Sequence, residues 1–329
     1  MTSKKLGTVE ASVQLIQDLY IDLKRKVNDW AAVTHQTSQA RMGYVGQHLV
    51  SVVTGYPGGR SGARGKDLVL PNGEFAEIKT CYRIDQLGRC NSCGSVVSSI
   101  EPECPNCGSD NLKRNDDSKW LISVRHDDEF VKVLDDKYYF LVLFDFVDLR
   151  SPDAIRATIW RADTKTPGFA YCMIDYYLNI RANSKSKAPF NLWPYQLKFD
   201  LLRAELIYAS VITDNSIETK MFPGRDSSTE SKLKPLQEYA RSSNLTDEAA
   251  ASFSSLLRLD MPAGKKKTTL LELQNQIAAQ GIPNHIVADA LAYAMYYPNI
   301  ESLIPVLPDR LRTQVQEITA KTLAAMQSR

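Results

Sequence analysis

Residues 64–79 read Arg64-Gly65-Lys66-Asp67-Leu68-Val69-Leu70-Pro71-Asn72-Gly73-Glu74-Phe75-Ala76-Glu77-Ile78-Lys79. Two short runs with alternating apolar residues flank Pro71-Asn72-Gly73, a pattern that is typical of a β-hairpin. If these three residues form the loop, Pro71 takes the first central position of a type I turn, where its fixed φ is favoured. Gly73 then takes the left-handed position of the bulge that closes such a loop.

This loop length decides which residues of the two strands face each other. Leu68 is predicted to face Ala76 and Asp67 to face Glu77, and such opposite pairs lie about 5 Å apart at Cβ on one face. Lys79 is two positions beyond Glu77 and points to the same side. The hairpin therefore predicts two carboxylates and an ammonium in one cluster, which suits Mg²⁺ with water and phosphate oxygens. The alternative is a surface hairpin held by a salt bridge.

The pattern Asp, nine residues, Glu-Ile-Lys resembles the catalytic signature of the PD-(D/E)xK nuclease superfamily, with Lys66 where that signature has Pro. The resemblance implies that Asp67 and Glu77 hold Mg²⁺ and that Lys79 positions the attacking water. In that fold a helix precedes the hairpin and often brings a polar side chain to the metal. A helix is predicted over residues 39–54, so Gln47 is a further catalytic candidate; a capping or surface glutamine is the alternative.

A glycine-rich loop at residues 55–65 carries Arg60 and Arg64 directly before the hairpin. Arginines and backbone amides beside a metal site suit phosphate oxygens, so these two residues and Lys66 are candidate DNA contacts. The alternative is that the loop is only a linker. The formal net charge of the whole chain is only +2, but residues 1–66 hold nine Lys or Arg against four Asp or Glu. That excess permits contact with a polyanion without requiring it.

Four cysteines follow the hairpin as two CxxC pairs ten residues apart, at Cys90, Cys93, Cys104 and Cys107. Each pair is followed by a glycine, which lets the backbone turn so that amides point at sulfur. Four thiolates satisfy tetrahedral Zn²⁺ and leave no open position, so we expect a structural zinc ribbon over residues 88–110. The ribbon either stabilises the fold alone or also presents Arg89, Lys113 and Arg114 to DNA. Lys119, just beyond it, is another candidate DNA contact.

Apolar periodicity predicts the remaining elements. Helical spacing covers residues 9–33, and three strand signals with the hairpin give about five strands, at 120–125, 138–147 and 157–161. Helices are also predicted in the last third, at 246–258, 268–280, 284–296 and 307–327. We therefore expect a nuclease domain over 1–225 that contains the ribbon, a polar linker at 226–231, and a helical C-terminal domain over 233–329.

Several segments together widen the resemblance, at 41–49, 63–68, 77–79, 116–120 and 188–192, with the ribbon between them. In this order they resemble type II restriction endonucleases of the MamI family, over roughly residues 10–215. The resemblance implies an α/β restriction-endonuclease-like mixed sheet flanked by helices, and Mg²⁺-dependent hydrolysis of double-stranded DNA at a specific sequence. It also implies a cognate DNA methyltransferase as functional partner. Cutting both strands of a symmetric site needs two active sites, so we expect a homodimer.

Composition limits the other function classes. No run approaches transmembrane length, and the N-terminal residues lack the apolar region of a signal peptide, so we expect a cytoplasmic protein without a membrane partner. The isolated cysteines, Cys81 and Cys172, are expected to be core thiols. Two rival functions stay open: a repair or mobile-element nuclease that recognises DNA structure, and a zinc-ribbon DNA-binding protein that does not cleave.

Overall fold

The computed structural model describes residues 5–35, 42–59, 66–82, 88–97, 103–113, 120, 122–148, 151–180, 184–185, 190–192, 199–241 and 245–328. The chain forms two compact units that interleave along the sequence. The first contains Met1–Leu121, Asp136–Ala162 and Glu205–Glu230, and the second contains Ile122–Asp135, Asp163–Ala204 and Ser231–Arg329. The predicted domains, 1–225 and 233–329, are not the same segments, and they remain a prediction about folding.

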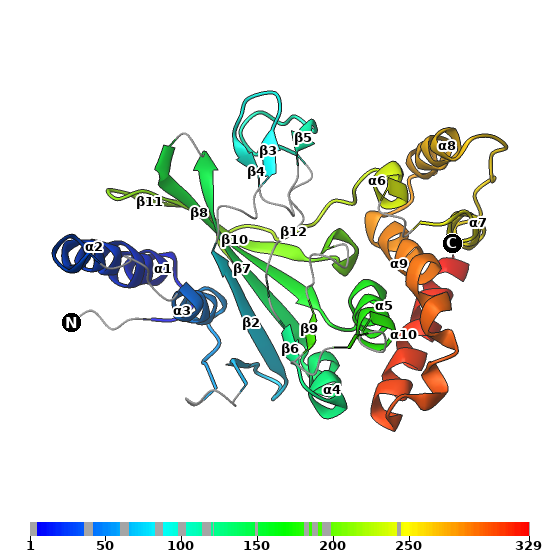
Figure 1. Ribbon diagram of the computed structural model, residues 1–329, viewed down its shortest axis with the longest axis horizontal. Helices are drawn as coiled ribbons and strands as arrows, with labels where there is room; N and C mark the ends of the chain where they lie inside the picture. The colour runs from blue at the N-terminus through cyan, green and yellow to red at the C-terminus, as the bar shows by residue number, and fades with distance from the viewer. Residues whose placement is uncertain are drawn as a thin grey trace. The chain divides into compact units, whose positions relative to one another are not determined.

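A seven-stranded mixed sheet forms the centre of the first unit (Figure 1). Its strands are β1 (Leu68–Val69), β2 (Phe75–Tyr82), β7 (Tyr138–Asp148), β8 (Ser151–Asp163), β10 (Glu205–Ile212), β11 (Ile217–Met221) and β12 (Thr229–Glu230). The order is β1-β2-β7-β8-β10-β11, with β12 pairing to β10. β1 is antiparallel to β2, whereas β2 is parallel to β7. A parallel pair needs a long crossover, and the chain between β2 and β7 holds the ribbon.

Two sequence-based expectations about this region are corrected, and two strands were not predicted. The strand predicted at 120–125 is β6 (Ile122–Val124), which pairs with β9 (Phe190–Leu192) in a separate two-stranded sheet of the second unit. The sheet also contains β10 and β11, an antiparallel pair joined by a turn in which the Thr213 amide donates to the Ser216 carbonyl. The polar stretch 226–231, expected to be a linker, contains β12, although the boundary between the two units does fall in it, between Glu230 and Ser231.

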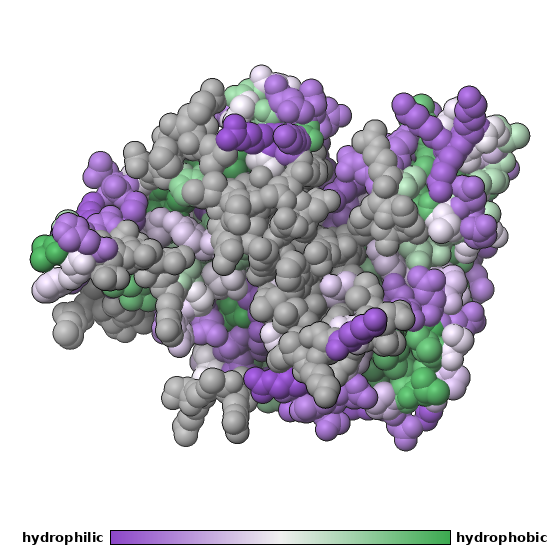
Figure 2. Space-filling model, viewed as in Figure 1, coloured by the Kyte–Doolittle hydropathy of each residue, from purple (hydrophilic) through white to green (hydrophobic). Residues whose placement is uncertain are grey.

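Helices α1 (Val9–Ile16), α2 (Asp22–Thr34) and α3 (Met42–Thr54) belong to the first unit. The single helix expected over 9–33 is interrupted by one π-helical turn, η1 (Gln17–Ile21). The apolar side of α3 is buried in the same core as Ala76 and Ile78 of β2, which fixes α3 against the predicted hairpin. Towards the end of α2, Trp30 and Val33 are 69% and 71% exposed, and Figure 2 shows hydrophobic surface there.

The second unit is mainly helical. Its elements beyond β6 and β9 are α4 (Asp127–Asp135), α5 (Pro167–Asp175), η3 (Tyr176–Ile180), η4 (Phe199–Leu202), α6 (Leu236–Arg241), α7 (Asp247–Leu256), α8 (Lys266–Ala279), α9 (Asn284–Glu301), η5 (Ile304–Val306) and α10 (Asp309–Gln327). The four C-terminal helices predicted from periodicity are confirmed as α7 to α10. α5 packs on α9, and its Gly168 lies so close to Leu201 that a Cβ would stand 1.7 Å from the Leu201 carbonyl oxygen. None of the helices in the described ranges is long and apolar enough to cross a membrane.

Candidate active site and metal centre

The hairpin has the predicted register. Leu68 pairs with Ala76 and Val69 with Phe75. The amide of Gly73 donates to the Leu70 carbonyl at 3.0 Å, and the Leu70 amide donates to the Glu74 carbonyl at 2.9 Å, so three residues form the loop. Gly73 has φ +80°, the left-handed conformation that glycine adopts without a steric cost. The paired residues end at Leu68, and Asp67, the residue before it, is joined to β2 through its side chain.

Asp67 is held by two different elements. Its Oδ2 accepts a hydrogen bond of 2.8 Å from the Ile78 amide of β2, and its Oδ1 accepts one of 3.0 Å from Nε2 of Gln47 on α3. The backbone carbonyl of Asp67 accepts from the Gly59 amide at 3.2 Å. The carboxylate orientation is therefore fixed from the strand, and Gln47 contacts Asp67 as a positioning partner.

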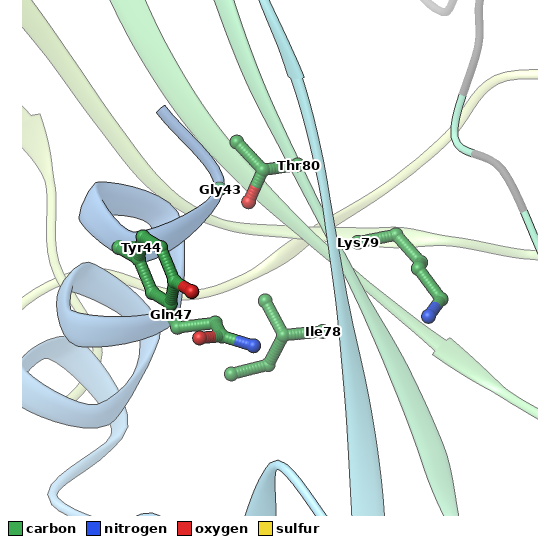
Figure 3. A pocket seen from close by; sticks show the side chains of 6 residues that line it. All are labelled: Gly43, Tyr44, Gln47, Ile78, Lys79 and Thr80. Atoms are coloured by element: carbon green, nitrogen blue, oxygen red, sulfur yellow. The ribbon is translucent and has the colours of Figure 1, made fainter. Parts of the chain in front are cut away.

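Glu77 and Lys79 lie on the face of β2 that is turned away from α3. Figure 3 shows Ile78 and Thr80 pointing toward the helix and Lys79 pointing to the other side of the strand. The Lys79 ammonium donates to Oε1 of Glu77 at 2.6 Å, and the two side chains are 25% and 23% exposed. Glu77 and Lys79 of the predicted cluster are thus paired and partly exposed, and Asp67 is bonded to the amide of Ile78, which lies between them in the sequence.

The electrostatics of Asp67 suit a cation. Burial raises the pKa of Asp67, and the negative charge of Glu77 raises it further, while the Ile78 amide, Lys79 and Gln47 lower it. A divalent cation between the two carboxylates would relieve this repulsion, so the donor set fits a hard ion such as Mg²⁺. The amide and carbonyl of a strand residue point to the same edge, which places the Ile78 carbonyl on the Asp67 side as a third oxygen donor.

A cavity of about 260 Å³ lies between α3 and β2, lined by Gly43, Tyr44, Gln47, Ile78, Lys79 and Thr80 (Figure 3). Tyr44 is 62% exposed. The helix approaches the strand closely beside this cavity, because a Cβ on Gly46 would stand 2.0 Å from Oγ1 of Thr80. The missing side chain of Gly46 is what allows the neighbouring Gln47 to reach Asp67.

Two buried residues beside the site were missed by the sequence analysis. Asp136 is 3% exposed and pairs with Lys66, Nζ to Oδ1, at 2.6 Å. Tyr139 is 2% exposed and lies opposite Glu77 in the parallel β2–β7 ladder. Burial raises the pKa of Tyr139 well above its usual value, and the charges of Glu77, Asp136 and Asp67 raise it further. A parallel pairing across some sixty residues leaves no local sequence signal.

The predicted DNA contacts are only partly within the described residues. Lys66 makes the ion pair with Asp136, and its ammonium lies 5.7 Å from the centroid of the Phe75 ring. Arg89 is exposed on β3 (Gly88–Cys90), directly opposite Lys113 on β5 (Leu112–Lys113). The remaining candidates lie outside the described residues: Arg60, Arg64, Arg114 and Lys119.

The four predicted cysteine ligands come together in the ribbon, whose strands are β3 (Gly88–Cys90), β4 (Val96–Val97) and β5 (Leu112–Lys113). Their sulfurs lie within 4.8 Å of one another, with Cys90–Cys107 at 3.7 Å and Cys93–Cys104 at 3.6 Å. Four ligands at a Zn–S distance of about 2.3 Å would be about 3.8 Å apart in a tetrahedron, so the spacing fits Zn²⁺.

The backbone of each CxxC pair turns as expected. Gly94 and Gly108 have φ of 74° and 70°, and each donates its amide to the carbonyl of the first cysteine of its pair. Hydrogen bonds from Ser95 lower the pKa of Cys93 to about 5. The Ser109 amide lowers the pKa of Cys107, but the neighbouring cysteine sulfurs outweigh it and raise that pKa to about 12. A bound cation would let all four thiolates coexist, so the cluster is able to hold a metal ion.

The other two cysteines, Cys81 and Cys172, are buried thiols that form no disulfide, as predicted.

Comparison with known proteins gives the class of protein. The family model described as MamI restriction endonuclease matches residues 29–237, more than half of the chain, so the chain belongs to the MamI family of restriction endonucleases. Among curated proteins, it is similar to the type II restriction enzyme MamI of Microbacterium ammoniaphilum, with 37% identity over 86 residues. That alignment covers 25% of this chain and only 27% of the relative. No solved structure matches the chain.

Proposed function

We propose that the chain is a Mg²⁺-dependent type II restriction endonuclease of the PD-(D/E)xK fold, which hydrolyses phosphodiester bonds of double-stranded DNA at a specific sequence. The proposal is supported mainly by the hairpin, in which Leu68 pairs with Ala76, Asp67 accepts from the Ile78 amide, and Lys79 donates to Glu77. The two hydrogen bonds that fix Asp67 support it, because a metal ligand is useful only when it is oriented in advance. Membership in the MamI family adds the substrate class.

Each residue of the site has a different proposed role. Asp67 and Glu77 hold the ion, and Gln47 keeps Asp67 in place. When bound, Mg²⁺ supplies Lewis acidity and stabilises negative charge on the phosphate. Lys79 orients a water molecule for in-line attack on phosphorus. The water oxygen forms the new P–O bond and loses a proton, the bond to the 3′ oxygen breaks, and that oxygen takes up a proton, which leaves a 5′-phosphate and a 3′-hydroxyl.

The ribbon and the basic residues complete the proposal. Zn²⁺ held by the four cysteines would staple the ribbon without taking part in the reaction. Arg89 and Lys113 place like charges opposite each other on its exposed surface, an unfavourable arrangement that a DNA phosphate would offset. Arg60, Arg64, Lys66, Arg114 and Lys119 remain predicted contacts. Lys66 would have to leave Asp136 to serve as one.

Assembly follows from the substrate. Two strands of a symmetric sequence are cut by two sites, so we propose a homodimer in the cleaving complex. A DNA methyltransferase with the same recognition sequence would protect the host. Sedimentation of the chain with and without DNA tests the first point, and methylated DNA that resists digestion would support the second.

Digestion of a long DNA of mixed sequence in Mg²⁺, followed by sequencing of the ends, tests the proposed function. Discrete bands whose ends share one sequence are expected. Asp67→Ala and Lys79→Ala should abolish cutting while DNA binding persists. A wild-type chain that binds DNA but cuts no DNA in Mg²⁺ would instead support a non-cleaving zinc-ribbon binder, and cutting set by DNA structure would support a repair or mobile-element nuclease.

A further inference from the structure

Lys66 lies one residue before Asp67, where the nuclease signature has proline. Its ammonium is 2.6 Å from Oδ1 of Asp136, whose side chain is only 4% exposed, while Lys66 itself is 31% exposed. Asp136 is fixed in turn by the next residue, because the Lys137 amide donates to the Phe75 carbonyl at 2.7 Å. The ion pair therefore connects Lys66, the residue before Asp67, with the segment that is hydrogen-bonded to Phe75, the first residue of β2.

The ammonium of Lys66 is on the catalytic face of the strand. Phe75, Glu77 and Lys79 alternate along β2 and share one face. Since the Lys66 ammonium lies over the Phe75 ring, it is on the same face as Glu77. The position of Tyr139 opposite Glu77 agrees, because Tyr139 is influenced by the charges of Glu77, Asp136 and Asp67 together.

Asp136 is not placed as a third metal ligand. Within the described part of the chain, the one group of three or more His, Cys, Asp or Glu side chains with ligand atoms inside 4.8 Å is the four cysteines. Asp136 thus does not gather with Asp67 and Glu77 at that distance. Asp136 forms an ion pair with Lys66, whose side chain has a flexible four-carbon stem and whose ammonium is a compact charge.

We propose that Asp136 is a positioning residue that holds the Lys66 ammonium away from Asp67 and Glu77, and so prevents a second ammonium, besides that of Lys79, from competing with a divalent cation for these carboxylates. Without Asp136, Lys66 would turn to Glu77, and an ammonium between the carboxylates would compete with the ion for the same charge. The inference rests on the proposed function, because it concerns the ion that the same pair would hold.

The proposal is tested, without any cleavage assay, by using electron paramagnetic resonance to measure the binding of Mn²⁺ to the zinc-loaded, DNA-free chain. Mn²⁺ is the probe because it accepts the same oxygen ligands. Asp136→Asn is expected to weaken Mn²⁺ binding about tenfold, since one added positive charge beside the site is worth roughly that much. Lys66→Met in the same chain should restore the affinity to near the wild-type value. Lys66→Met alone should bind Mn²⁺ at least as tightly as the wild type.

The matched control is Asp214→Asn, which removes the ion pair of Lys24 with Asp214 at 3.3 Å and should leave Mn²⁺ binding unchanged. Wild-type affinity in Asp136→Asn would overturn the proposal. So would a double variant as weak as Asp136→Asn, because a general loss of structure cannot be repaired by removing Lys66. If Asp136→Asn does not fold, weaker binding by Lys66→Met alone overturns it. A wild type whose Mn²⁺ binding is unaffected by Asp67→Ala would overturn the proposed function instead.

Discussion

The Gln47 amide donates a 3.0 Å hydrogen bond to Oδ1 of Asp67, across twenty positions of the chain. Because Oδ2 is bonded to the Ile78 amide, both oxygens of the carboxylate have a fixed partner. Each oxygen keeps a second lone pair, so the carboxylate is still able to bind a cation. The helix thus sets the orientation of an acid that belongs to the hairpin.

Gln47→Leu should move the acid limb of the pH–rate profile to higher pH. The Gln47 hydrogen bond lowers the pKa of Asp67, so its loss raises that pKa and leaves less of the ionised form. Cleavage near neutral pH should fall about tenfold, the size of a lost hydrogen bond to a charged group. Measuring kcat/KM against pH checks this. Gln14→Leu is the matched control, because Gln14 also donates to an aspartate from a helix, but far from the site; an unmoved limb in Gln47→Leu would contradict the role.

Asp67→Asn should stabilise the metal-free chain at neutral pH although it abolishes cleavage. In the folded state, burial and Glu77 raise the pKa of Asp67, so folding favours the protonated form. The stability from this group is complete below the unfolded pKa and is lost as pH rises through the folded value. Asparagine does not ionise, so the variant does not lose this stability as the pH rises. The Tm without metal should therefore be higher in the variant at pH 7 and equal at low pH, and Mg²⁺ should raise the Tm of the wild type alone. A lower Tm in the variant at pH 7 would count against the argument.

Gly46→Ala should weaken both folding and cleavage. Its Cβ would lie 2.0 Å from Oγ1 and 3.0 Å from Cβ of Thr80, so α3 must move away from β2 and carry Gln47 with it. Overpacking of this kind costs about 1–3 kcal/mol in unfolding free energy. Gly43→Ala is the control on the same helix, because a Cβ there meets nothing within 4 Å; it should be neutral or stabilise by up to about 1 kcal/mol. Urea unfolding and cleavage rates separate the two variants, and equal effects would refute the packing argument.

Cys104→Ser should release the ribbon metal and lower the Tm of the chain. Val96 of β4 is fully buried in the same core as β2 and α3, so a disordered ribbon removes a side chain from that core. Atomic absorption is expected to find one zinc ion per wild-type chain and none in the variant. Cys172→Ala, outside the cluster, should retain the ion. Zinc bound by Cys104→Ser with wild-type affinity would mean that the four sulfurs are not the ligands.

Local sequence rules were enough for the hairpin and the ribbon. Pro71 and Gly73 set the loop, and the loop length alone set the pairing of Leu68 with Ala76. The CxxC spacing and the two following glycines likewise predicted the cysteine cluster. These features depend on contacts between residues close together in the chain, where backbone geometry leaves few choices.

The residues around the site could not be predicted, because they depend on contacts between residues far apart in the chain. Asp136 and Tyr139 reach the site through the parallel pairing of β2 with β7, and a continuous apolar run such as β7 does not state its neighbour. The strand predicted at 120–125 was assigned to the wrong sheet for the same reason. Gln47 was identified by resemblance to a family, and its contact with Asp67 depends on the close approach allowed by Gly46.

The segment Pro57–Gly59 runs along the free side of β1. Gly58 bridges to Leu68, the Val69 amide donates to the Pro57 carbonyl, and the Gly59 amide donates to the Asp67 carbonyl. The strand at this edge, β1, is only two residues long, and the segment Pro57–Gly59 occupies the hydrogen-bonding groups on its outer side. Such an edge offers no template on which a second chain can add a strand, so the edge of the sheet next to Asp67 is protected against aggregation.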